Sequence, residues 1–580
     1  MTDPGLFPDV VAPSVGDASQ QRRDATAEIT DRGAKIRRSA LWAAYGDALG
    51  WITELTDPAG LRRRTGGAPL YRPIEWTRRI GGRAGITTLL PQGCYSDDSQ
   101  LRLATGRAIG PNGFDVEAFA KVELPIWLSY GLGGGKSTSA AAANLAKPKA
   151  TWFANTFKGW INSGGNGAAM RIQPHVWAAC MPDNAESFLP DVIRNTICTH
   201  SHPIGILGSV LHALTLARTI VTGRYPSADD LLAATDVAAD LPDVIQHDTE
   251  VGTYWRVAFE QKSGAFSEAW VRAIDECKEA IRVADGNTSN ESGADRYASI
   301  VDCLKLREKE RRGSGMLTAV AAVGLIWCET RPEEALRIAA NAIGTDTDTI
   351  ATMAGAILGV AAGTEPPVEV LDVDLFRSEA DRLTDIARGG RPEGHQYPDL
   401  LRWSAPRARA DTLIRSKDGK LYVRGLGWAK ALDEPMLSSK QDFMWQWLKL
   451  EAGQTLLIKR RRELMGDAEA AEILSTLQSS ERASKTDGDS NKSNPKAQQM
   501  GDTRTPSTTA SRIPSEKLPK PLNLQRALDY ITKHKDDDES IGYALRRVVH
   551  QGTPGQIAAF TSALIDHLRQ YEKVRHSSHG

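Results

Sequence analysis

Two pairs of aspartates stand where helices are expected to begin. Asp346 and Asp348 lie in IGTDTDTIATMAGAILG, and Asp97 and Asp98 lie in CYSDDSQLRLATGRAIG. One carboxylate is enough to cap a helix and to complement its dipole, so the second acid of each pair is surplus to capping. Carboxylates and hydroxyls are the hard oxygen ligands that Mg²⁺ and Mn²⁺ prefer. If the two helix ends converge, they could hold two such ions about 3.5–4 Å apart and a water ready as nucleophile.

Three further segments carry residues that could act at such a site. In YGDALGWITEL, Asp47 and Glu54 could act at the site, but each by itself is more readily explained without such a role, Asp47 as a hydrogen-bonded core acid and Glu54 as an ordinary surface acid. Glycines flank Asn166 in GGNGAAMRIQPH, which suggests backbone amides that cradle a phosphate, although Gly-Asn-Gly is also a common turn. His200 and His202 precede a predicted helix; a metal-binding pair is the less favoured interpretation, and His200 is expected to form a polar wall of a pocket.

The elements that must position these residues are helices. Between residue 35 and about residue 388, apolar residues recur three and four positions apart, which predicts an all-α domain without convincing strands. In PEEALRIAANAIG, Pro332 precedes the expected start of a helix and Gly344 its end. A helix beginning at Thr349 would bury a face formed by Ile350, Met353, Ala354, Ile357 and Leu358.

The composition changes on both sides of this helical domain, which spans residues 31–388. Residues 1–30 are rich in Pro, Asp, Ser and Gly and are predicted to form a flexible tail. Residues 389–478 are predicted to form a small mixed α/β segment: a hairpin that turns at KDGK, then an amphipathic helix in SKQDFMWQWLKLEAGQTLLIKRRREL. Residues 479–520 are predicted to be a disordered linker, and residues 521–580 a small helical module.

The composition of the whole chain limits the classes of protein to which it could belong. Lys and Arg total 71 and Asp and Glu total 72, so the net charge of −1 gives no global reason to expect nucleic-acid or membrane binding. Six scattered cysteines without a C-x-x-C pair predict free, mostly buried thiols in a reducing compartment. We expect neither a signal peptide nor an apolar stretch approaching the roughly 18–20 residues that span a bilayer. A cytoplasmic protein without a membrane partner is therefore predicted.

One glycine-rich segment imitates a nucleotide-binding loop. YGLGGGKSTSA has the glycines, lysine and serine of a P-loop, but Tyr130 occupies the position of its first glycine. The preceding AFAKVELPIWLS is not a convincing buried strand. A kinase or ATPase function is therefore not expected.

Five motifs, in this order and spacing, resemble the ADP-ribosylglycohydrolase superfamily, which includes the dinitrogenase-reductase-activating glycohydrolases. They are GDALG at 46–50 with Glu54, SDDS at 96–99, GNGAAMR at 165–171, TH at 199–200 and GTDTDT at 344–349. The resemblance covers residues 33–388 and implies a compact all-α fold with a site for two Mg²⁺ ions, or Mn²⁺ in their place. SDDS replaces the usual TDDT, and Thr345 replaces a glycine, but neither change removes an oxygen ligand.

The resemblance also implies roles for particular residues. The implied metal ligands are Ser96, Asp97, Asp98, Asp346, Asp348 and Thr349. The implied substrate-binding residues are Gly165, Asn166, Gly167, Ala168, Met170 and His200, which would hold the pyrophosphate of ADP-ribose. The implied catalytic residues are Glu54, Asp97 and Asp98, and the sequence does not decide which carboxylate is the acid or base.

The resemblance implies a metal-dependent hydrolase that removes ADP-ribose from a modified protein or another acceptor. Water would attack the anomeric carbon through an oxocarbenium-like transition state. Two alternatives stay open: a catalytically silent ADP-ribose-binding or scaffold protein, and a hydrolase of a related ADP-ribosyl metabolite. The long C-terminal extension leaves room for a protein partner, and the sequence leaves nucleic acid as an acceptor undecided.

Overall fold

The structure is a computed structural model of the 580-residue chain. It describes residues 18–67, 69–286, 292–400, 402–464 and ten further positions between 531 and 564. Of residues 18–30 it describes the backbone alone. The chain divides into two compact units, residues 1–492 and 493–580.

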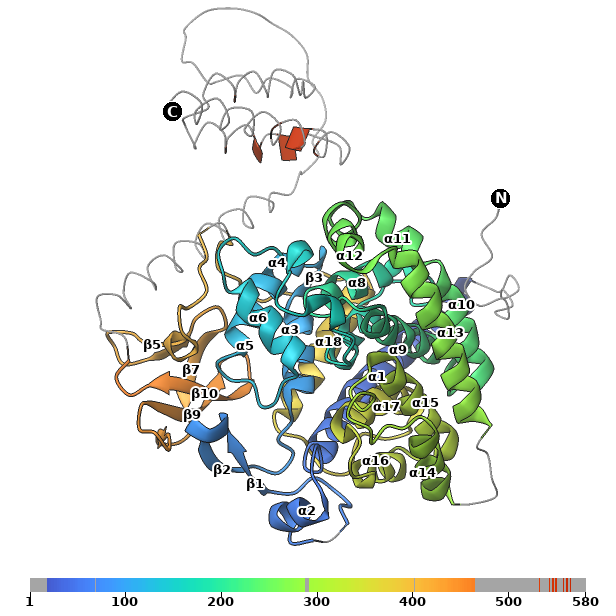
Figure 1. The fold of residues 1–580 in the computed structure, drawn as a ribbon, viewed down its shortest axis with the longest axis horizontal. Coiled ribbons are helices and arrows are strands. Elements are labelled where there is room, and N and C mark those ends of the chain that lie inside the picture. Colours follow the sequence, from blue (N-terminus) through green and yellow to red (C-terminus); the bar gives the residue numbers. More distant parts are fainter. Residues whose placement is uncertain are drawn as a thin grey trace, which may run out of the picture. The chain divides into compact units, whose positions relative to one another are not determined.

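The first unit is built around a pair of long helices, α1 (Ala18–Gly50) and α17 (Thr347–Ala361). Four helices pack around this pair, as Figure 1 shows: α9 (Pro203–Thr222), α15 (Gly315–Cys328), α16 (Pro332–Asn341) and α18 (Val373–Ala387). The expected apolar face of α17 is fully buried. Helix α16 begins at Pro332 itself, which was expected to precede it, and ends at Asn341, three residues before Gly344. Helix α17 begins at Thr347, two residues before the expected start. The prediction of a mainly helical domain is confirmed.

The remaining helices complete the shell of the helical domain. In its first half they are α2 (Pro58–Thr65), α3 (Asp97–Arg107), α4 (Val116–Ala118), α5 (Leu124–Trp127), α6 (Lys136–Leu145), α7 (Gln173–Trp177) and α8 (Leu189–Ile197). In its second half they are α10 (Ala228–Ala239), α11 (Leu241–His247), α12 (Arg256–Ser263), α13 (Phe266–Asp285) and α14 (Gly293–Cys303). The thiols of Cys94, Cys198, Cys277 and Cys328 are buried and free, as predicted.

One helix corrects an expectation about apolar length. Among the described residues α9 is long and apolar enough to cross a membrane, although we expected no such stretch. In the structure 83% of its apolar window is buried inside the protein. The core helix of a soluble protein has the same length and composition, so α9 by itself is weak evidence for a membrane span.

Two small antiparallel hairpins interrupt the helical domain, where no strand was expected. β1 (Trp76–Ile80) pairs with β2 (Ile86–Leu90) so that Trp76 faces Leu90, and β3 (Ile109–Gly110) pairs with β4 (Gly113–Phe114). The first hairpin buries alternate residues of β2 and leaves the others exposed. That two-residue period occupies only five residues, which is too short to stand out in a helical background.

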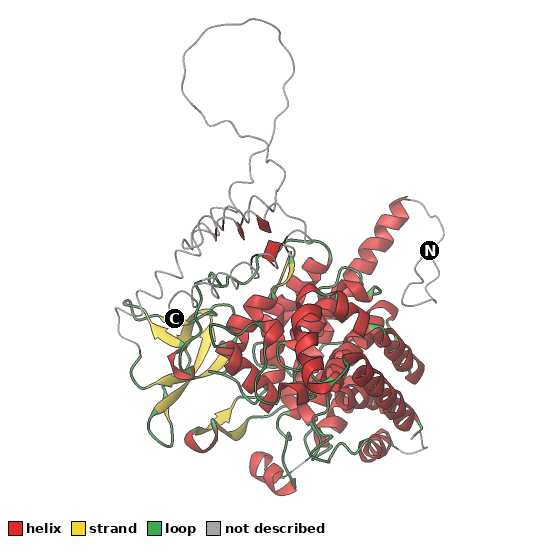
Figure 2. Cartoon of the chain, turned by 45° about the horizontal axis from the view of Figure 1, so that its top comes forward, coloured by secondary structure: helices red, strands yellow, loops and turns green. Residues whose placement is uncertain are grey.

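A six-stranded antiparallel sheet follows the helices, shown as the group of yellow strands in Figure 2. Its strands are β5 (Leu413–Arg415), β6 (Leu421–Val423), β7 (Gly427–Ala431), β8 (Met436–Leu437), β9 (Phe443–Leu450) and β10 (Thr455–Arg461). They lie in the order β10-β9-β7-β6-β5, and β8 also pairs with β9. The hairpin predicted around KDGK is confirmed, since Leu413 of β5 faces Val423 of β6.

The amphipathic helix predicted for SKQDFMWQWLKLEAGQTLLIKRRREL is wrong. This segment forms β9 and β10, which pair antiparallel so that Leu448 faces Leu456. Gly453, with φ +97°, lies in the turn between them. Most of β9 is buried on both faces, so its apolar residues form a nearly continuous run. Such a run fits a helix and a buried strand equally, and the pairing of β9 with β7 decides between them.

Towards its two ends the chain was predicted to form a flexible tail, a linker and a small helical module. Helix α1 starts at Ala18, so the predicted tail is wrong for residues 18–30, which contain no proline and several good helix formers. The predicted linker, residues 479–520, lies outside the described residues. In the second unit the described positions are helical, and four of them are buried: Ile531, Val548, Phe560 and Leu564.

Candidate metal centre

Close packing of α1 against α17 brings the end of one helix to the start of the other. A Cβ at Gly46 of α1 would overlap the backbone carbonyl of Ala351, and a Cβ at Gly50 would overlap that of Thr347. Gly355 of α17 lies equally close to the backbone of α1. Larger side chains would force the helices apart. The glycines therefore place the residues that follow α1 beside those that open α17.

The acids at this junction form one cluster. Carboxylate oxygens of Glu54, Asp346 and Asp348 lie within 4.8 Å of one another. Asp348 is buried and the other two are half-buried, so one side of the cluster is accessible. Asp346 occupies the N-cap position of α17, but its side chain makes no capping hydrogen bond. Its Oδ2 accepts from Nδ2 of Asn166 at 2.9 Å instead, so capping does not explain Asp346.

The second aspartate pair stands at the start of α3. Ser96 is the N-cap of that helix, and its Oγ accepts from the amide of Asp98 at 3.1 Å. Asp47 holds the turn from the other side, because its carboxylate accepts from the amides of Ser96 at 3.0 Å and Ser99 at 2.9 Å. Asp47 is fully buried in α1. It is therefore a hydrogen-bonded core acid that positions the start of α3.

The two pairs meet through Asp98. Its Oδ1 lies 3.5 Å from the hydroxyl of Thr349, which directly follows Asp348. Its Oδ2 is buried and has no hydrogen-bond partner among the described residues. A buried carboxylate oxygen without a partner is costly, so this atom marks a position suited to a ligand of opposite charge.

The acids raise one another's pKa values. Burial raises the pKa of Asp97 well above its ordinary value, and the charges of Glu54 and Asp47 raise it further. Burial also raises the pKa of Asp98, with Asp47 and Asp97 acting in the same direction. The pKa of Asp348 is raised by burial first, then by Glu54 and Asp98. A bound cation would relieve this repulsion between like charges.

The six residues predicted as metal ligands all lie at this junction. They are Ser96, Asp97, Asp98, Asp346, Asp348 and Thr349. Every donor atom is an oxygen, and neither Cys nor His is among them. Together with the unpartnered Oδ2 of Asp98, this donor set fits hard divalent cations such as Mg²⁺ and Mn²⁺ better than Zn²⁺.

The loop predicted to cradle a phosphate lies beside the same acids. The amide of Asn166 donates to the carbonyl of Gly313 at 2.9 Å, and its side chain donates to Asp346. The amide of Met170 donates to the carbonyl of Asn166 at 3.1 Å. The side chains of Met170 and Ala168 are buried. Two amides of the loop are thus already used inside the protein, and Asn166 holds one of the cluster's carboxylates.

His200 packs against the same loop. A Cβ at Gly165 or at Gly167 would lie 3.4 Å from its Nε2, and its Nδ1 is 2.7 Å from the hydroxyl of Thr199. Burial lowers the pKa of His200 to about 3, and the charge of Arg171 acts in the same direction. The ring is therefore a neutral neighbour of the loop.

Arg171 holds this loop from behind, although the sequence assigned it no role. Its guanidinium donates to the carbonyl of Gly167 at 2.6 Å, to Oδ1 of Asn195 at 2.9 Å and to the hydroxyl of Thr199 at 2.8 Å. The guanidinium carbon also lies 5.3 Å from the centre of the Phe119 ring. Its place in the GNGAAMR motif was the only signal for this role.

Two other contacts at the acids were not predicted. Arg78 of β1 pairs with Oε2 of Glu54 at 3.1 Å and lies over the ring of Trp51 at 5.0 Å. Gly133, from the segment that imitates a P-loop, lies so close to Asp97 that a Cβ would overlap its carboxylate. The run of glycines in YGLGGGKSTSA could have indicated that another part of the chain approaches this backbone closely. Nothing in the sequence distinguished Arg78 from the other arginines.

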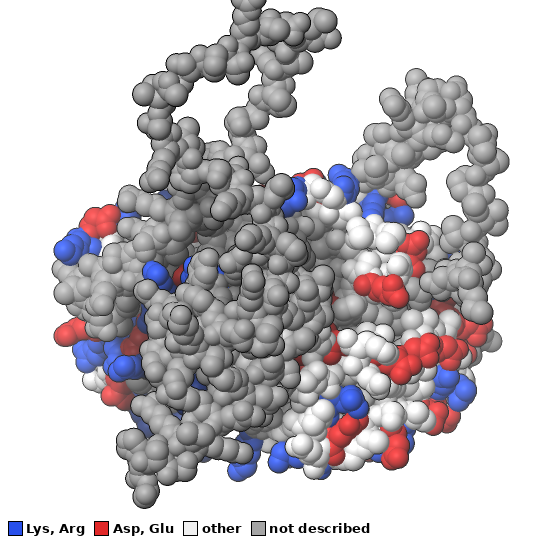
Figure 3. All heavy atoms as spheres, turned by 90° about the horizontal axis from the view of Figure 1, so that it is seen from above, with Lys and Arg blue, Asp and Glu red and all other residues white. Residues whose placement is uncertain are grey.

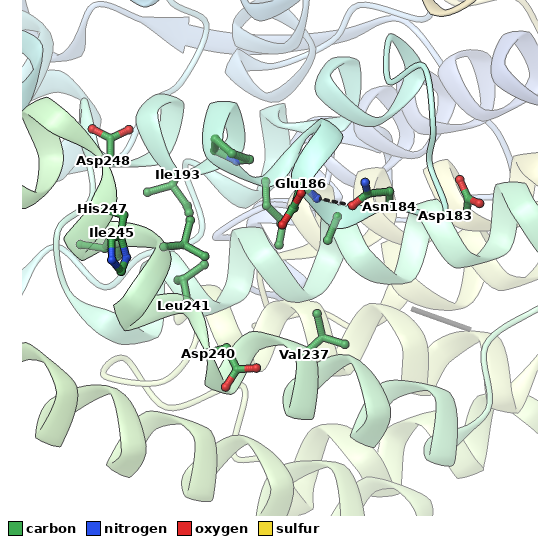
Figure 4. A pocket seen from close by; sticks show the side chains of 14 residues that line it. Asp183, Asn184, Glu186, Ile193, Val237, Asp240, Leu241, Ile245, His247 and Asp248 are labelled. Carbon is green, nitrogen blue, oxygen red and sulfur yellow. Dashed lines mark hydrogen bonds between the residues drawn. The ribbon is translucent and has the colours of Figure 1, made fainter. Parts of the chain in front are cut away.

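A separate cavity of about 750 Å³ lies among α8, α10 and α11. Figure 4 shows the side chains of Ile193, Leu241 and Ile245 in it, with Asp240 and Asp248 nearby. No residue predicted for the site is among the described residues that line this cavity.

The chain resembles known proteins in sequence and in structure. The profile of the family described as ADP-ribosylglycohydrolase matches residues 28–389. "Uncharacterized protein YegU" of Escherichia coli (strain K12) is 28% identical over 229 residues, which are 38% of this chain and 55% of YegU. The chain thus matches about half the length of that relative. A solved structure titled "ADP-ribosylglycohydrolase-related protein complex" has a TM-score of 0.39 and 20% identity, over 62% of this chain and 99% of its own.

Proposed function

The chain belongs to the ADP-ribosylglycohydrolase family, and on this premise we propose that it hydrolyses the glycosidic bond between ADP-ribose and a modified acceptor, with divalent cations as cofactors. Membership of the family supports a glycohydrolase-type function; the substrate and the cations are our proposal. One observation carries it: carboxylates from three distant segments meet at one junction. They are Glu54, Asp97, Asp98, Asp346 and Asp348.

The oxygen ligands at this junction are proposed to hold two Mg²⁺ ions, or Mn²⁺ in their place. When bound, such ions would neutralise the acids, bind hydroxyls of the ribose and lower the pKa of a water molecule. Asn166 would keep Asp346 in place by its 2.9 Å hydrogen bond. Asp47 would do the same for the start of α3, through the amides of Ser96 and Ser99.

The chain's own residues supply the remaining parts of the reaction. Glu54 is half-buried at the accessible side of the cluster, where Arg78 fixes its carboxylate. It is therefore our first candidate to accept the proton of the attacking water, with Asp97 and Asp98 as the alternatives. The bond from the anomeric carbon to the acceptor breaks through an oxocarbenium-like transition state, and the acceptor leaves with a proton.

The loop at Gly165–Met170, with His200 behind it, is proposed to bind the pyrophosphate of ADP-ribose. The glycines at 165 and 167 leave room for the ring of His200 to pack against the loop, and this neutral ring adds no charge beside the proposed pyrophosphate. The amides of Asn166 and Met170 are used inside the protein, so the amides of Gly167 and Ala168 are the proposed donors.

The test is release of free ADP-ribose by the purified full chain. ADP-ribosyl-arginine, ADP-ribosyl-serine and an ADP-ribosylated oligonucleotide would each be incubated with Mg²⁺, with Mn²⁺ and with a chelator. We expect release that the chelator and Asp346→Ala both abolish. The matched control is Asp236→Asn, because this exposed acid pairs with Lys278 and lies outside the cluster. Tight binding of ADP-ribose without release from any substrate would instead assign a silent binding protein.

A further inference from the structure

A second cavity, of about 680 Å³, adjoins the carboxylate cluster, and arginine is the most frequent residue in its lining. Its walls come from the segment after α1, from α2, from β1 and from the loop before α15. The five arginines that line it are Arg63, Arg64, Arg78, Arg79 and Arg312, against one acid, Asp57. Such a wall attracts anions.

The cavity lies beside the carboxylate cluster, through residues that are next to the acids in the chain or paired with them. Leu55, the neighbour of Glu54, lines it, and so does Gly344, two residues before Asp346. The ion pair between Arg78 and Glu54 stands between the cavity and the acids. A group bound in this cavity would therefore lie on the Arg78 side of the carboxylate cluster.

Most of these arginines have no acid partner of their own. Among the described ion pairs, only that of Arg78 with Glu54 involves one of the five. Arg64 donates to the carbonyls of Ile52 and Glu54, which orients it without neutralising it. In Arg312, Nη2 donates to a carbonyl, whereas Nε is buried without a partner in the described chain. Guanidinium groups with spare donors are well suited to phosphate oxygens.

The positive charge continues beyond the cavity. Residues 58–85 contain seven arginines and a single acid, Glu75, although the whole chain has a net charge of −1. Helix α2 and strand β1, both labelled in Figure 1, belong to this stretch, and α2 packs on β1. On the uncovered part of the face drawn in Figure 3, by contrast, basic and acidic side chains are interspersed. The arginine surface is thus a local feature that the overall charge conceals.

The extent of this surface favours several phosphates over one. A phosphorylated peptide offers one or two phosphate groups, whereas a nucleic acid presents a row of them to a row of arginines. The residues that line the cavity include no aromatic side chain, so they suit phosphates and not stacked bases. We infer that the arginine surface of α2 and β1 binds the phosphate backbone of a nucleic acid. A second step rests on the proposed function: the acceptor from which this protein removes ADP-ribose is then a nucleic acid.

The test measures binding separately from hydrolysis. Fluorescence anisotropy of a labelled single-stranded 20-mer would be recorded with the full chain over a series of salt concentrations. The variant combines Arg63→Glu with Arg83→Glu, since both side chains are exposed and neither makes a described hydrogen bond or ion pair. The matched control combines Arg224→Glu with Arg272→Glu, which makes the same charge change at exposed arginines outside residues 58–85.

We expect the variant to bind at least about tenfold more weakly, and its salt slope to fall by about 1.4, while the control binds like the native chain. Arg79→Glu, inside the cavity, is expected to weaken binding in the same direction. The variant should also lower the rate ratio of an ADP-ribosylated oligonucleotide to ADP-ribosyl-arginine. Absence of oligonucleotide binding, or equal weakening by the control, would overturn the inference. A chain that binds the oligonucleotide but releases no ADP-ribose would refute the proposed function and leave the binding surface standing.

Discussion

Asp372 and Asp98 are both buried carboxylates, and their surroundings are opposite. Asp372, just before α18, accepts from the hydroxyl of Tyr95 at 2.8 Å, from the amide and hydroxyl of Thr455 at 2.6 and 2.7 Å, and from Lys449. Asp98 lies among other acids, and its Oδ2 has no hydrogen-bond partner in the described chain.

This difference in hydrogen-bond partners distinguishes an acid with a structural role, Asp372, from an acid suited to binding a ligand, Asp98. Asp372 joins the helical domain to the sheet, because Lys449 belongs to β9 and Thr455 to β10. All its acceptor capacity is used, so it stabilises the fold without needing another group. The cluster around Asp98 is stabilised fully only when something positive enters it. Removing the charge of Asp372 should therefore lower stability and leave activity nearly unchanged. Removing a charge from the cluster around Asp98 should lower activity and leave stability unchanged or higher.

The largest expected effect is on hydrolysis by Asp348→Asn. Loss of one carboxylate from the cluster should lower kcat by about 10³-fold or more, which corresponds to about 4 kcal/mol of transition-state stabilisation. Without divalent cations the same variant should be at least as stable as the native chain, because a repelling charge is gone. Steady-state kinetics and thermal unfolding in chelator test both parts. A variant that unfolds at a clearly lower temperature would place Asp348 with the structural acids.

The second effect concerns the cations themselves. Mg²⁺ at about 100 times its Kd should raise the free energy of unfolding of the native chain by about 2.7 kcal/mol. Asp346→Ala should remove most of this gain, whereas Asp236→Asn should keep it. Calorimetric or fluorescence melting with and without Mg²⁺ measures it. An equal gain in all three proteins would mean that the cation binds elsewhere.

A smaller loss of stability is expected for Asp372→Asn. Asparagine tolerates the left-handed backbone of this residue, φ +62°, so the change mainly removes the charge that faces Lys449. We expect a loss of about 2 kcal/mol, since the hydrogen-bond donors around it stay buried. Urea unfolding in the absence of cations measures the loss, and hydrolysis per folded molecule should change little. Unchanged stability would contradict the contrast drawn with Asp98.

The smallest expected effect is on the pH dependence of stability, and it comes from three buried histidines that are neutral in the folded chain. Burial lowers the pKa values of His175, His200 and His212 to about 3, below the unfolded value near 6.5. Between these two values the unfolded chain binds more protons, so stability is full above about pH 6.5 and falls as the pH falls towards 3. His212→Gln should reduce this slope by up to about 1.4 kcal/mol per pH unit. Urea unfolding at pH 7, 6 and 5 measures it, and an unchanged slope would show that His212 is protonated in the fold.

The sequence predicted the elements of the helical domain more reliably than those of the sheet. The three-and-four spacing identified the buried face of α17 correctly, and Pro332 located the start of α16 to within about one residue, because a helix is held by contacts between near neighbours in the chain. The run in β9 was misassigned because it is apolar on both faces. Strand β9 is held by its pairing with β7, which precedes it in the chain, and with β10, which follows it. A pattern read within β9 alone carries no information about these partners.

The sequence by itself determined the chemistry available to this protein. Two aspartate pairs, their neighbouring hydroxyls and Glu54 are all hard oxygen donors, whatever the fold. Only the tertiary structure decided which of them meet and what surrounds them. The packing of Gly46 and Gly50 on α17 brings Glu54 to Asp348, and the hairpin of β1 brings Arg78 to Glu54. These contacts join residues far apart in the chain, and burial at the junction then sets their pKa values.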